Sequence, residues 1–452
     1  MMVTPPKPKS RANDASIFER VFSFRRDVFQ SQPEKLYRAW MAESRLPFYR
    51  SYFINQPELV KTILNERPDD FPKSGIIKGA LESLLGNSVF VTNGQVWKRQ
   101  RRIIDPAFEG GKVKFAFPSM KAAVEDCVER LRAQAGNVVE IEEEASKLAA
   151  DIIFRTLFSI PITDAVAQEV FQGFRDYQRT QPLLNVASFL NSPGLFSIFQ
   201  RRKTKRKAAV IRRLLTRLTN ERAREIEAGT APDDLATKIM TTKDPLTGQR
   251  FSDEEMVDQV AIFFLAGHET SASALAWTLY CLAADQPVQD RMVEQVRAVE
   301  DLELRKFSKM PFVRDVFREG LRLYPPVPMM VREVTRPEEF RQREVKVGSQ
   351  IVLSPWHLGR HERFWDNPDV FDPDRWSRDE TKEAARKCYM PFSSGPRVCT
   401  GASFAMVEGV LSLALLTKSL KFTVVEGKVP VPQAHLTVRS KDGIFLKIEE
   451  RD

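Results

Sequence analysis

The most constraining feature of the sequence is residues 391–401, PFSSGPRVCTG, a loop-like segment in which Cys399 lies between two glycines. A long apolar stretch of helical character, ASFAMVEGVLSLALL, follows it directly. Turn amides and the positive end of a helix stabilise a thiolate, and a thiolate can ligate iron. The alternative is a structural cysteine, because free cysteine is among the most often buried residue types. The glycine-flanked setting of Cys399 favours the ligand.

A second motif, FFLAGHETSAS, occupies residues 263–273 in the middle of a long stretch with helical periodicity. A glycine inside a helix, here Gly267, costs roughly 1 kcal/mol relative to alanine. The polar pair Glu269 and Thr270 on an otherwise apolar face is also costly unless it has partners. These costs indicate function. The alternative is a notch of small residues for helix packing, with Glu269 in solvent.

Glu319 and Arg322 lie three residues apart in FVRDVFREGLRLY, and therefore share one face of a helix. That helix should begin near Pro311 and end before Pro325, since a residue that precedes proline avoids helical geometry. An ion pair on a solvated helix is the alternative interpretation.

Trp97 and Arg101 in GQVWKRQRR are four residues apart, and so also face the same way. An indole N–H and a permanently charged guanidinium suit a carboxylate ligand. The alternative is that both side chains cover a basic surface helix.

The chain as a whole has the pattern of one large, helix-rich domain with a small β component. Residues 1–15 are expected to form a disordered leader, and residues 16–452 the domain. Ser252 and Glu255 should form a capping box at the start of a helix of about eight turns. Helical spacing occurs at 120–132, 141–157, 208–226, 254–284 and 288–299, and strand signals occur at 344–347, 350–353, 421–425 and 444–449.

Composition excludes several classes of protein. The chain has 452 residues and a net charge of +9, but no zinc finger, heptad pattern or basic-aromatic RNA-binding signature, so no nucleic-acid partner is expected. No apolar run reaches the ~18 residues that span a bilayer, which predicts that there is no transmembrane anchor. Four irregularly spaced cysteines and the lack of an apolar signal region predict a reducing, cytoplasmic location.

The spacing F-x-x-G-x-R-x-C-x-G resembles the haem-ligand loop of the cytochrome P-450 family, the haem-thiolate monooxygenases. Its fixed positions are Phe392, Gly395, Arg397, Cys399 and Gly401. The resemblance implies a haem b cofactor (iron protoporphyrin IX), with Cys399 as axial iron ligand, Arg397 on a haem propionate and Phe392 shielding the sulfur. An anionic sulfur ligand favours cleavage of a bound O–O bond.

The other motifs resemble the same family. Residues 266–270, AGHET, are similar to its oxygen-activation motif, in which Ala266 and Gly267 open the helix for dioxygen and Thr270 relays protons with Glu269. His268 lies about 200° around the helix from Thr270, so it is expected to pack or to form a hydrogen bond rather than to bind iron. By the same resemblance Glu319, Arg322 and Arg375 form a structural triad, although Asp374 and Trp376 depart from the family's P-E-R-F pattern. Further propionate contacts implied by the resemblance are Trp97, Arg101 and Arg332.

The family resemblance implies a mainly α, triangular, single-domain fold that inserts one oxygen atom from O2 into a C–H bond of a lipophilic substrate. A medium- or long-chain fatty acid or related lipid is favoured, and a terpenoid or an aromatic compound is the alternative. Further alternatives are a peroxygenase that uses H2O2 and a non-catalytic haem sensor; the retained Glu269–Thr270 pair argues against both. Pocket residues implied by the resemblance are Leu265, Val327, Met329 and Leu436.

Partners are also implied by the resemblance. Electrons should come from a separate ferredoxin and ferredoxin reductase, because no flavin or ferredoxin sequence is present, and the protein is expected to be a monomer. The basic residues expected on the docking face are Lys98, Arg99, Arg102, Arg386 and Lys387. Residues 182–207 are expected to form a lid over the substrate channel; a second interpretation is weak, transient contact with an anionic membrane surface.

Overall fold

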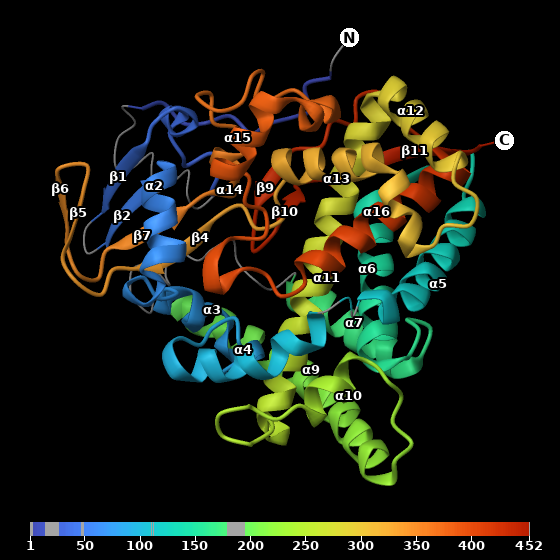
Figure 1. Ribbon diagram of the computed structural model, residues 1–452, viewed down its shortest axis with the longest axis horizontal. Coiled ribbons are helices and arrows are strands. Elements are labelled where there is room, and N and C mark those ends of the chain that lie inside the picture. Colours follow the sequence, from blue (N-terminus) through green and yellow to red (C-terminus); the bar gives the residue numbers. More distant parts are fainter. Residues whose placement is uncertain are drawn as a thin grey trace.

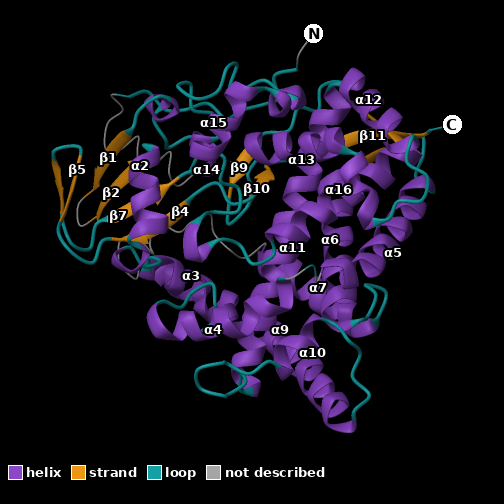
Figure 2. Ribbon diagram, viewed as in Figure 1, coloured by secondary structure: helices purple, strands orange, loops and turns teal. Residues whose placement is uncertain are grey.

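The computed structural model describes residues 3–13, 27–46, 49–109, 111, 113–178 and 195–451. The molecule has a roughly triangular outline, with most strands on one side and the longer helices on the other (Figures 1 and 2). The prediction of a mainly helical single domain with a small β component is confirmed. Residues 182–194 of the predicted lid, 182–207, lie outside the described residues, so that interpretation stays a prediction, as does the monomer.

The helices in the described part of the chain include every segment predicted as helical. They are α2 (Pro57–Lys61), α3 (Gly75–Leu85), α4 (Gly94–Phe108), α5 (Val113–Arg132), α6 (Ile141–Phe158), α7 (Ala165–Gln178), α9 (Leu195–Ala228), α10 (Leu235–Thr241), α11 (Asp253–Ala284), α12 (Gln286–Arg297), α13 (Pro311–Leu323), α14 (Pro355–Leu358), α15 (Asp379–Cys388) and α16 (Ala402–Ser419).

Helix α11 runs through the middle of the molecule and is buried over most of its length (Figure 1). The predicted capping box is present at its start. The Glu255 amide donates to Ser252 Oγ at 3.2 Å, and the Ser252 amide donates to a Glu255 carboxylate oxygen at 2.9 Å. These bonds satisfy two amides that have no partner within the helix. The capping box therefore fixes the residue at which the helix that carries the AGHET motif begins.

The strands form small sheets whose partners are far apart in sequence. One sheet has the order β1-β2-β7-β4, with β2 parallel to β7, and a second has the order β3-β11-β8. The predicted strands correspond to β6, β7, β8 and β11, whereas the others were not predicted from the sequence. The strands are β1 (Met41–Leu46), β2 (Tyr49–Ile54), β3 (Val138–Glu140), β4 (Met330–Glu333), β5 (Glu338–Phe340), β6 (Arg343–Val345), β7 (Gln350–Leu353), β8 (Leu420–Val424), β9 (Pro432–Ala434), β10 (Val438–Ser440) and β11 (Phe445–Glu450).

Glu319, Arg322 and Arg375 form a fully buried ion-pair triad, as the resemblance implied. The Glu319 carboxylate accepts hydrogen bonds from Arg322 at 2.8 and 2.9 Å and from Arg375 at 2.8 Å. The two guanidiniums also donate to backbone carbonyls of residues 359–370. The triad therefore fixes the chain that leads to the Cys399 loop, and the interpretation as a solvated surface pair is wrong.

The two departures from the family pattern beside Arg375 have local explanations. Asp374 turns outward and binds Arg291 at 2.7 and 2.8 Å. Trp376 is buried against Trp365 and Tyr389. Neither change disturbs Arg375.

The amino-terminal segment differs from the prediction of a disordered leader. In residues 3–13 the Val3 carbonyl accepts the Phe371 amide at 2.9 Å, and the Pro6 carbonyl accepts the Tyr324 hydroxyl at 2.7 Å. Lys7 pairs with Asp369. Backbone carbonyls, which composition does not reveal, hold this segment against the domain.

One helix of the described residues, α16, is long and apolar enough to cross a membrane, which the sequence analysis did not anticipate. About half of it, 56% of an 18-residue window, is buried inside the protein. It packs on α5, α11, α12 and α13. A helix with these contacts is a core helix.

Candidate functional site

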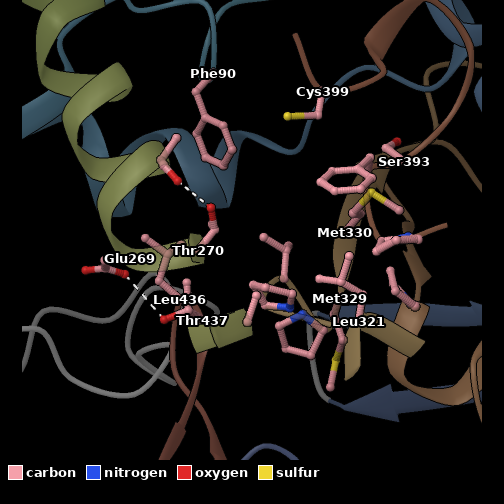
Figure 3. A pocket seen from close by; sticks show the side chains of 18 of the residues that line it. Phe90, Glu269, Thr270, Leu321, Met329, Met330, Ser393, Cys399, Leu436 and Thr437 are labelled. Atoms are coloured by element: carbon pink, nitrogen blue, oxygen red, sulfur yellow. Dashed lines mark hydrogen bonds between the residues drawn. The ribbon is translucent and has the colours of Figure 1, made fainter. Parts of the chain in front are cut away.

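A cavity of about 540 Å³ lies between α11, the loop that carries Cys399, β4 and the turn between β9 and β10. Figure 3 shows its interior, with Cys399 on one side and Thr270 on the other. Of the residues predicted for the site, Gly395 and the Glu319 triad do not line the cavity. Those that do are Trp97, Arg101, Leu265, Ala266, Gly267, Glu269, Thr270, Val327, Met329, Arg332, Phe392, Arg397, Cys399, Gly401 and Leu436.

Cys399 presents its sulfur to the cavity immediately before α16. Its amide donates to the Phe392 carbonyl at 3.0 Å, which closes the loop. Burial raises the pKa of the Cys399 thiol, while the Gly401 amide and the Arg101 charge act in the opposite direction. The Gly401 amide thus acts in the direction expected of a turn amide, while burial favours the protonated thiol. A positive metal ion is what would remove the proton here.

Gly395 explains the shape of the loop. Its φ is +70°, and a Cβ at this position would lie 2.1 Å from the Leu64 carbonyl oxygen. A side chain here would push the loop away from residues 62–66. Gly395 is therefore required by a close backbone approach.

Ala266 and Gly267 have different roles. Ala266 is exposed to the cavity, whereas a Cβ on Gly267 would lie 2.7 Å from Ile153 Cδ1 of α6. The small residue at 267 therefore serves helix packing, as the alternative interpretation held, and Ala266 supplies the opening. Thr270, also facing the cavity, donates from Oγ1 to the Ala266 carbonyl.

Glu269 is buried, not solvated, and points away from Cys399 toward Thr437 (Figure 3). Its carboxylate accepts hydrogen bonds from Gln178 Nε2 and from Thr437 Oγ1, the latter at 3.5 Å. Arg439 lies 3.8 Å from the same carboxylate and donates to Gln178 at 2.8 Å. Burial raises the pKa of Glu269, and Arg439, Gln178 and Thr437 partly counteract it. None of these three partners was predicted from the sequence.

His268 does not face the cavity. It is fully buried, and its Nε2 lies 2.7 Å from Ser146 Oγ. Burial lowers the pKa of His268 to about 3, so the ring is neutral. The expectation of a packing and hydrogen-bonding residue is confirmed.

A group of cations surrounds Trp97 at the rim of the cavity. Lys73 Nζ, the Arg101 guanidinium and the Arg397 guanidinium lie 5.7, 5.7 and 5.4 Å from the Trp97 ring. Arg101 is already bound to Asp105 at 2.8 Å and to the Val398 carbonyl at 2.8 Å. Arg101 therefore braces the Cys399 loop, and its propionate contact stays a prediction.

The remaining cations, Lys73, Arg332 and Arg397, lack a carboxylate within ion-pair distance among the residues that the structure describes. The Nε atoms of Arg332 and Arg397 are buried without hydrogen-bond partners there. Burial, followed by the nearby arginines, lowers the pKa of Lys73 to about 6, and burial lowers that of Arg332 to about 10. Three cations that share a partly buried rim, with backbone carbonyls as the partners of Lys73 and Arg397, would be compensated by a bound anion. Sequence reasoning missed Lys73 because it belongs to no motif.

The two carboxylates of haem b would supply the negative charge that compensates these cations. With a sulfur at one wall to hold iron, an apolar lining and three cations at the rim, the residues of the cavity fit haem. Fold and site thus define a haem-thiolate protein, and haem b, once bound, supplies the iron chemistry that activates dioxygen.

Comparison with known proteins leads to the same family. The sequence profile described as Cytochrome P450 matches residues 19–448, so the chain belongs to the cytochrome P450 family and is a monooxygenase of that family. It is 32% identical over 397 residues to cyclooctat-9-en-7-ol 5-monooxygenase of Streptomyces melanosporofaciens, covering 86% of this chain and 83% of the relative. It is 28% identical over 429 residues to human cytochrome P450 4X1, covering 89% and 82%.

The fold is shared with solved structures of the family. The retinoic acid-bound cyanobacterial CYP120A1 has a TM-score of 0.80 at 22% identity, covering 97% of this chain and 95% of that one. The cytochrome P450DA haem domain has a TM-score of 0.81 at 22% identity, covering 100% and 99%. At this identity the likeness concerns the fold.

Proposed function

We propose that the protein hydroxylates a C–H bond of a lipophilic substrate, with a medium- or long-chain fatty acid or a related lipid as the first candidate. The observation that carries this proposal is the apolar lining of the cavity between Thr270 and Cys399. Its side chains offer shape and apolar contact rather than charge to a substrate. The apolar side chains of this lining include Phe90, Phe263, Leu265, Val327, Met329 and Leu436.

Different residues of the chain have different roles in such a reaction. Cys399 holds the iron, and Lys73, Arg332 and Arg397 hold the carboxylates of the cofactor. Ala266 leaves room for a small molecule beside Thr270, whose hydroxyl can turn from the Ala266 carbonyl to a new acceptor. Glu269 is an acid close to this hydroxyl but turned from it, so proton delivery requires rotation of its side chain or intervening water.

A second candidate substrate class is a terpenoid or other cyclic alcohol. The observation that favours it is the 32% identity to an enzyme named for cyclooctat-9-en-7-ol. Met329 and Met330 at the cavity wall suit irregular ligands, because methionine is flexible and polarisable.

The proposed electron donor is a separate ferredoxin, reduced by its own reductase. Four of the five cations expected at the docking face have ion-pair partners: Arg99 binds Glu255, Arg102 binds the buried Asp244, and Lys98 and Lys387 bind Asp69 and Glu383. Arg386 on α15 is exposed and has no ion-pair partner within the described residues. Arg386 is therefore a better candidate than Arg102 for attracting an acidic partner protein.

The experiment is an optical titration of the ferric protein with a fatty-acid series, a terpenoid set and small aromatics. Displacement of water from iron by a substrate gives a spin-state shift. A saturable shift that strengthens with fatty-acid chain length supports the first candidate, and a shift with the cyclic alcohols alone replaces it with the second. Absence of any shift with all three sets contradicts a lipophilic substrate.

A further inference from the structure

Residues 86–93, which join α3 to α4, form neither helix nor strand but carry a large apolar side chain into the cavity. This side chain is Phe90, which is 37% exposed, and Figure 3 shows its ring directed into the cavity. Connecting segments of this kind are usually among the more mobile parts of a fold. The position of the Phe90 ring therefore depends on the groups that hold residues 86–93 in place.

Two consecutive buried residues of α11 bind the backbone of this segment. The Asn87 amide donates to an Asp258 carboxylate oxygen at 2.7 Å, and the Val89 amide donates to Gln259 Oε1 at 2.9 Å. Both side chains of α11 are buried. Because the two amides are only two residues apart, these bonds fix the chain immediately before Phe90.

An arginine of α9 supplies the positive charge that the buried Asp258 needs. The Arg212 guanidinium lies 2.7 Å from the second carboxylate oxygen of Asp258, and it also donates to the Leu84 carbonyl at 3.0 Å. A Cβ on Gly86, whose φ is +50°, would lie 2.1 Å from the same Asp258 oxygen. The chain therefore passes directly against the carboxylate, with no room for a side chain between them.

The carbonyl groups of the same segment are bound from other parts of the structure. Gln100 Nε2 of α4 donates to the Asn87 carbonyl at 2.6 Å, and Lys73 Nζ donates to the Val89 carbonyl at 2.7 Å. Residues 87 and 89 are thus bound through their amides by α11 and through their carbonyls by these two side chains. The Phe90 side chain therefore projects from a backbone that is held on both sides.

We propose that Asp258 and Gln259 are positioning residues that set the substrate specificity of the cavity through Phe90. By holding the backbone before Phe90, they keep its ring at the cavity wall, where it limits the width of a ligand. The substrate class that fits such a wall is a lipophilic molecule with a slender, unbranched end, whereas bulky ring systems are disfavoured. The inference rests on the proposed function for a lipophilic substrate and adds the shape of that substrate.

The structure provides a matched set of variants. Asp258→Ala removes one amide acceptor, and Asp258→Asn retains one. Gln259→Met removes the other acceptor with little change in volume and no change in charge, so the test does not depend on whether Asp258→Ala folds. Glu144→Ala is the control. Glu144 is 7% exposed against 5% for Asp258, and it binds Arg130 of a neighbouring helix at 2.8 Å, but it lies outside the cavity lining.

The probes are imidazole and 4-phenylimidazole, which bind ferric haem iron through nitrogen and change its optical spectrum. The measured quantity is the ratio of their dissociation constants in the haem-loaded protein, because only the second probe carries a bulky ring. Phe90→Ala should shift this ratio several-fold in favour of 4-phenylimidazole. Asp258→Ala and Gln259→Met should shift it in the same direction, whereas Asp258→Asn and Glu144→Ala should keep the wild-type ratio.

The double variant Phe90→Ala with Asp258→Ala tests whether the acid acts through the ring. Its ratio should equal that of Phe90→Ala alone, since a ring that is absent cannot be displaced. Effects that multiply in the double variant overturn the proposal. So does a wild-type ratio in Asp258→Ala and Gln259→Met, or an equal shift in the control Glu144→Ala, which would reflect general loosening of the fold.

Binding of the two probes requires haem but no substrate and no turnover. If the expected ratios are found and neither fatty acids nor cyclic alcohols shift the spin state, the proposed function fails and the positioning role of Asp258 and Gln259 stands. If fatty acids shift the spin state and the ratios do not change in any variant, the positioning role fails and the proposed function stands.

Discussion

Glu269 and Thr270 are adjacent in sequence, but their side chains bind to different parts of the structure. Thr270 faces the cavity and donates to the Ala266 carbonyl, whereas the Glu269 carboxylate, at the cavity wall, is turned toward Gln178 and Thr437, from which it accepts hydrogen bonds; Figure 3 shows the contact with Thr437. An acid and an alcohol separated in this way can deliver protons in sequence only if one of them changes its bond or water lies between them. The two residues should therefore respond differently to substitution.

Thr270→Ala should raise the fraction of electrons lost to peroxide several-fold while protein stability changes by less than about 1 kcal/mol, because the lost bond is a single hydroxyl-to-carbonyl bond within one helix. Thr270→Ser should retain most of the coupling. The measurement is the ratio of hydroxylated product to peroxide at fixed NAD(P)H consumption. Wild-type coupling in Thr270→Ala would show that this hydroxyl is not used.

Arg439→Met should move the pH profile of turnover toward higher pH. Burial raises the pKa of Glu269, and Arg439 is the largest of the influences that lower it. Removal of this cation raises the pKa further, so any limb of the profile that reports Glu269 shifts upward. Lys441→Met, an exposed cation one residue beyond the same strand, is the control and should leave the profile in place. A downward shift in Arg439→Met contradicts the assignment.

These two cases also show what the sequence could and could not predict. Cys399, Ala266, Thr270, Glu319 and Arg322 were found because short spacings within one loop or one helix place them on a common face. The partners of Glu269 come from α7 and from the turn before β10, about 90 and 170 residues away in the chain, and no local pattern encodes such pairing.

The pairing of the strands also could not be predicted from local sequence patterns. β2 pairs in parallel with β7, and register Ser51 to Gln350 joins residues about 300 positions apart. Short strands are stabilised by their neighbours rather than by intrinsic propensity. β7 was predicted from its apolar residues, but its partners β2 and β4 could not be inferred from the same kind of signal.

Glu319→Ala should destabilise the protein by about 3–5 kcal/mol, since it leaves Arg322 and Arg375 buried without a counter-charge. The measurement is urea unfolding of the haem-loaded protein followed by far-UV circular dichroism. Asp374→Ala is the matched control, because its ion pair with Arg291 is about half exposed on both sides and should contribute about 0–1 kcal/mol. Similar losses for the two variants would show that the triad is not a structural centre.

Lys73→Met should remove a pH dependence of haem retention. In the cavity without an anion, the pKa of Lys73 is lowered to about 6 by burial and by the nearby arginines. A haem carboxylate beside it would raise that pKa toward the ordinary value, so haem binding above about pH 6 takes up a proton, and affinity falls as pH rises. The rate of haem transfer to excess apomyoglobin should therefore increase from about pH 6 to about pH 8 in the wild type.

In Lys73→Met this transfer should be faster at about pH 6 and show a weaker rise with pH. Lys98→Met is the control, since the Lys98 side chain is 40% exposed and pairs with Asp69 at 2.8 Å. If the rate of haem transfer rises with pH in Lys73→Met as steeply as in the wild type, the haem carboxylates are bound by Arg332 and Arg397 alone.

Arg386→Glu should weaken reduction by an acidic ferredoxin without altering the substrate-induced spin shift. The side chain is exposed on α15, and the structure gives it no ion pair among the described residues, so its reversal disturbs no internal bond. Arg102→Glu, by contrast, would place a carboxylate against buried Asp244, and its effect would mix docking with folding.

Charge attraction at a docking face acts mainly on the association rate and is screened by salt. The reduction rate measured against ionic strength should therefore fall several-fold at low salt and lose part of its salt dependence in Arg386→Glu. An unchanged rate at low salt would move the docking site away from α15.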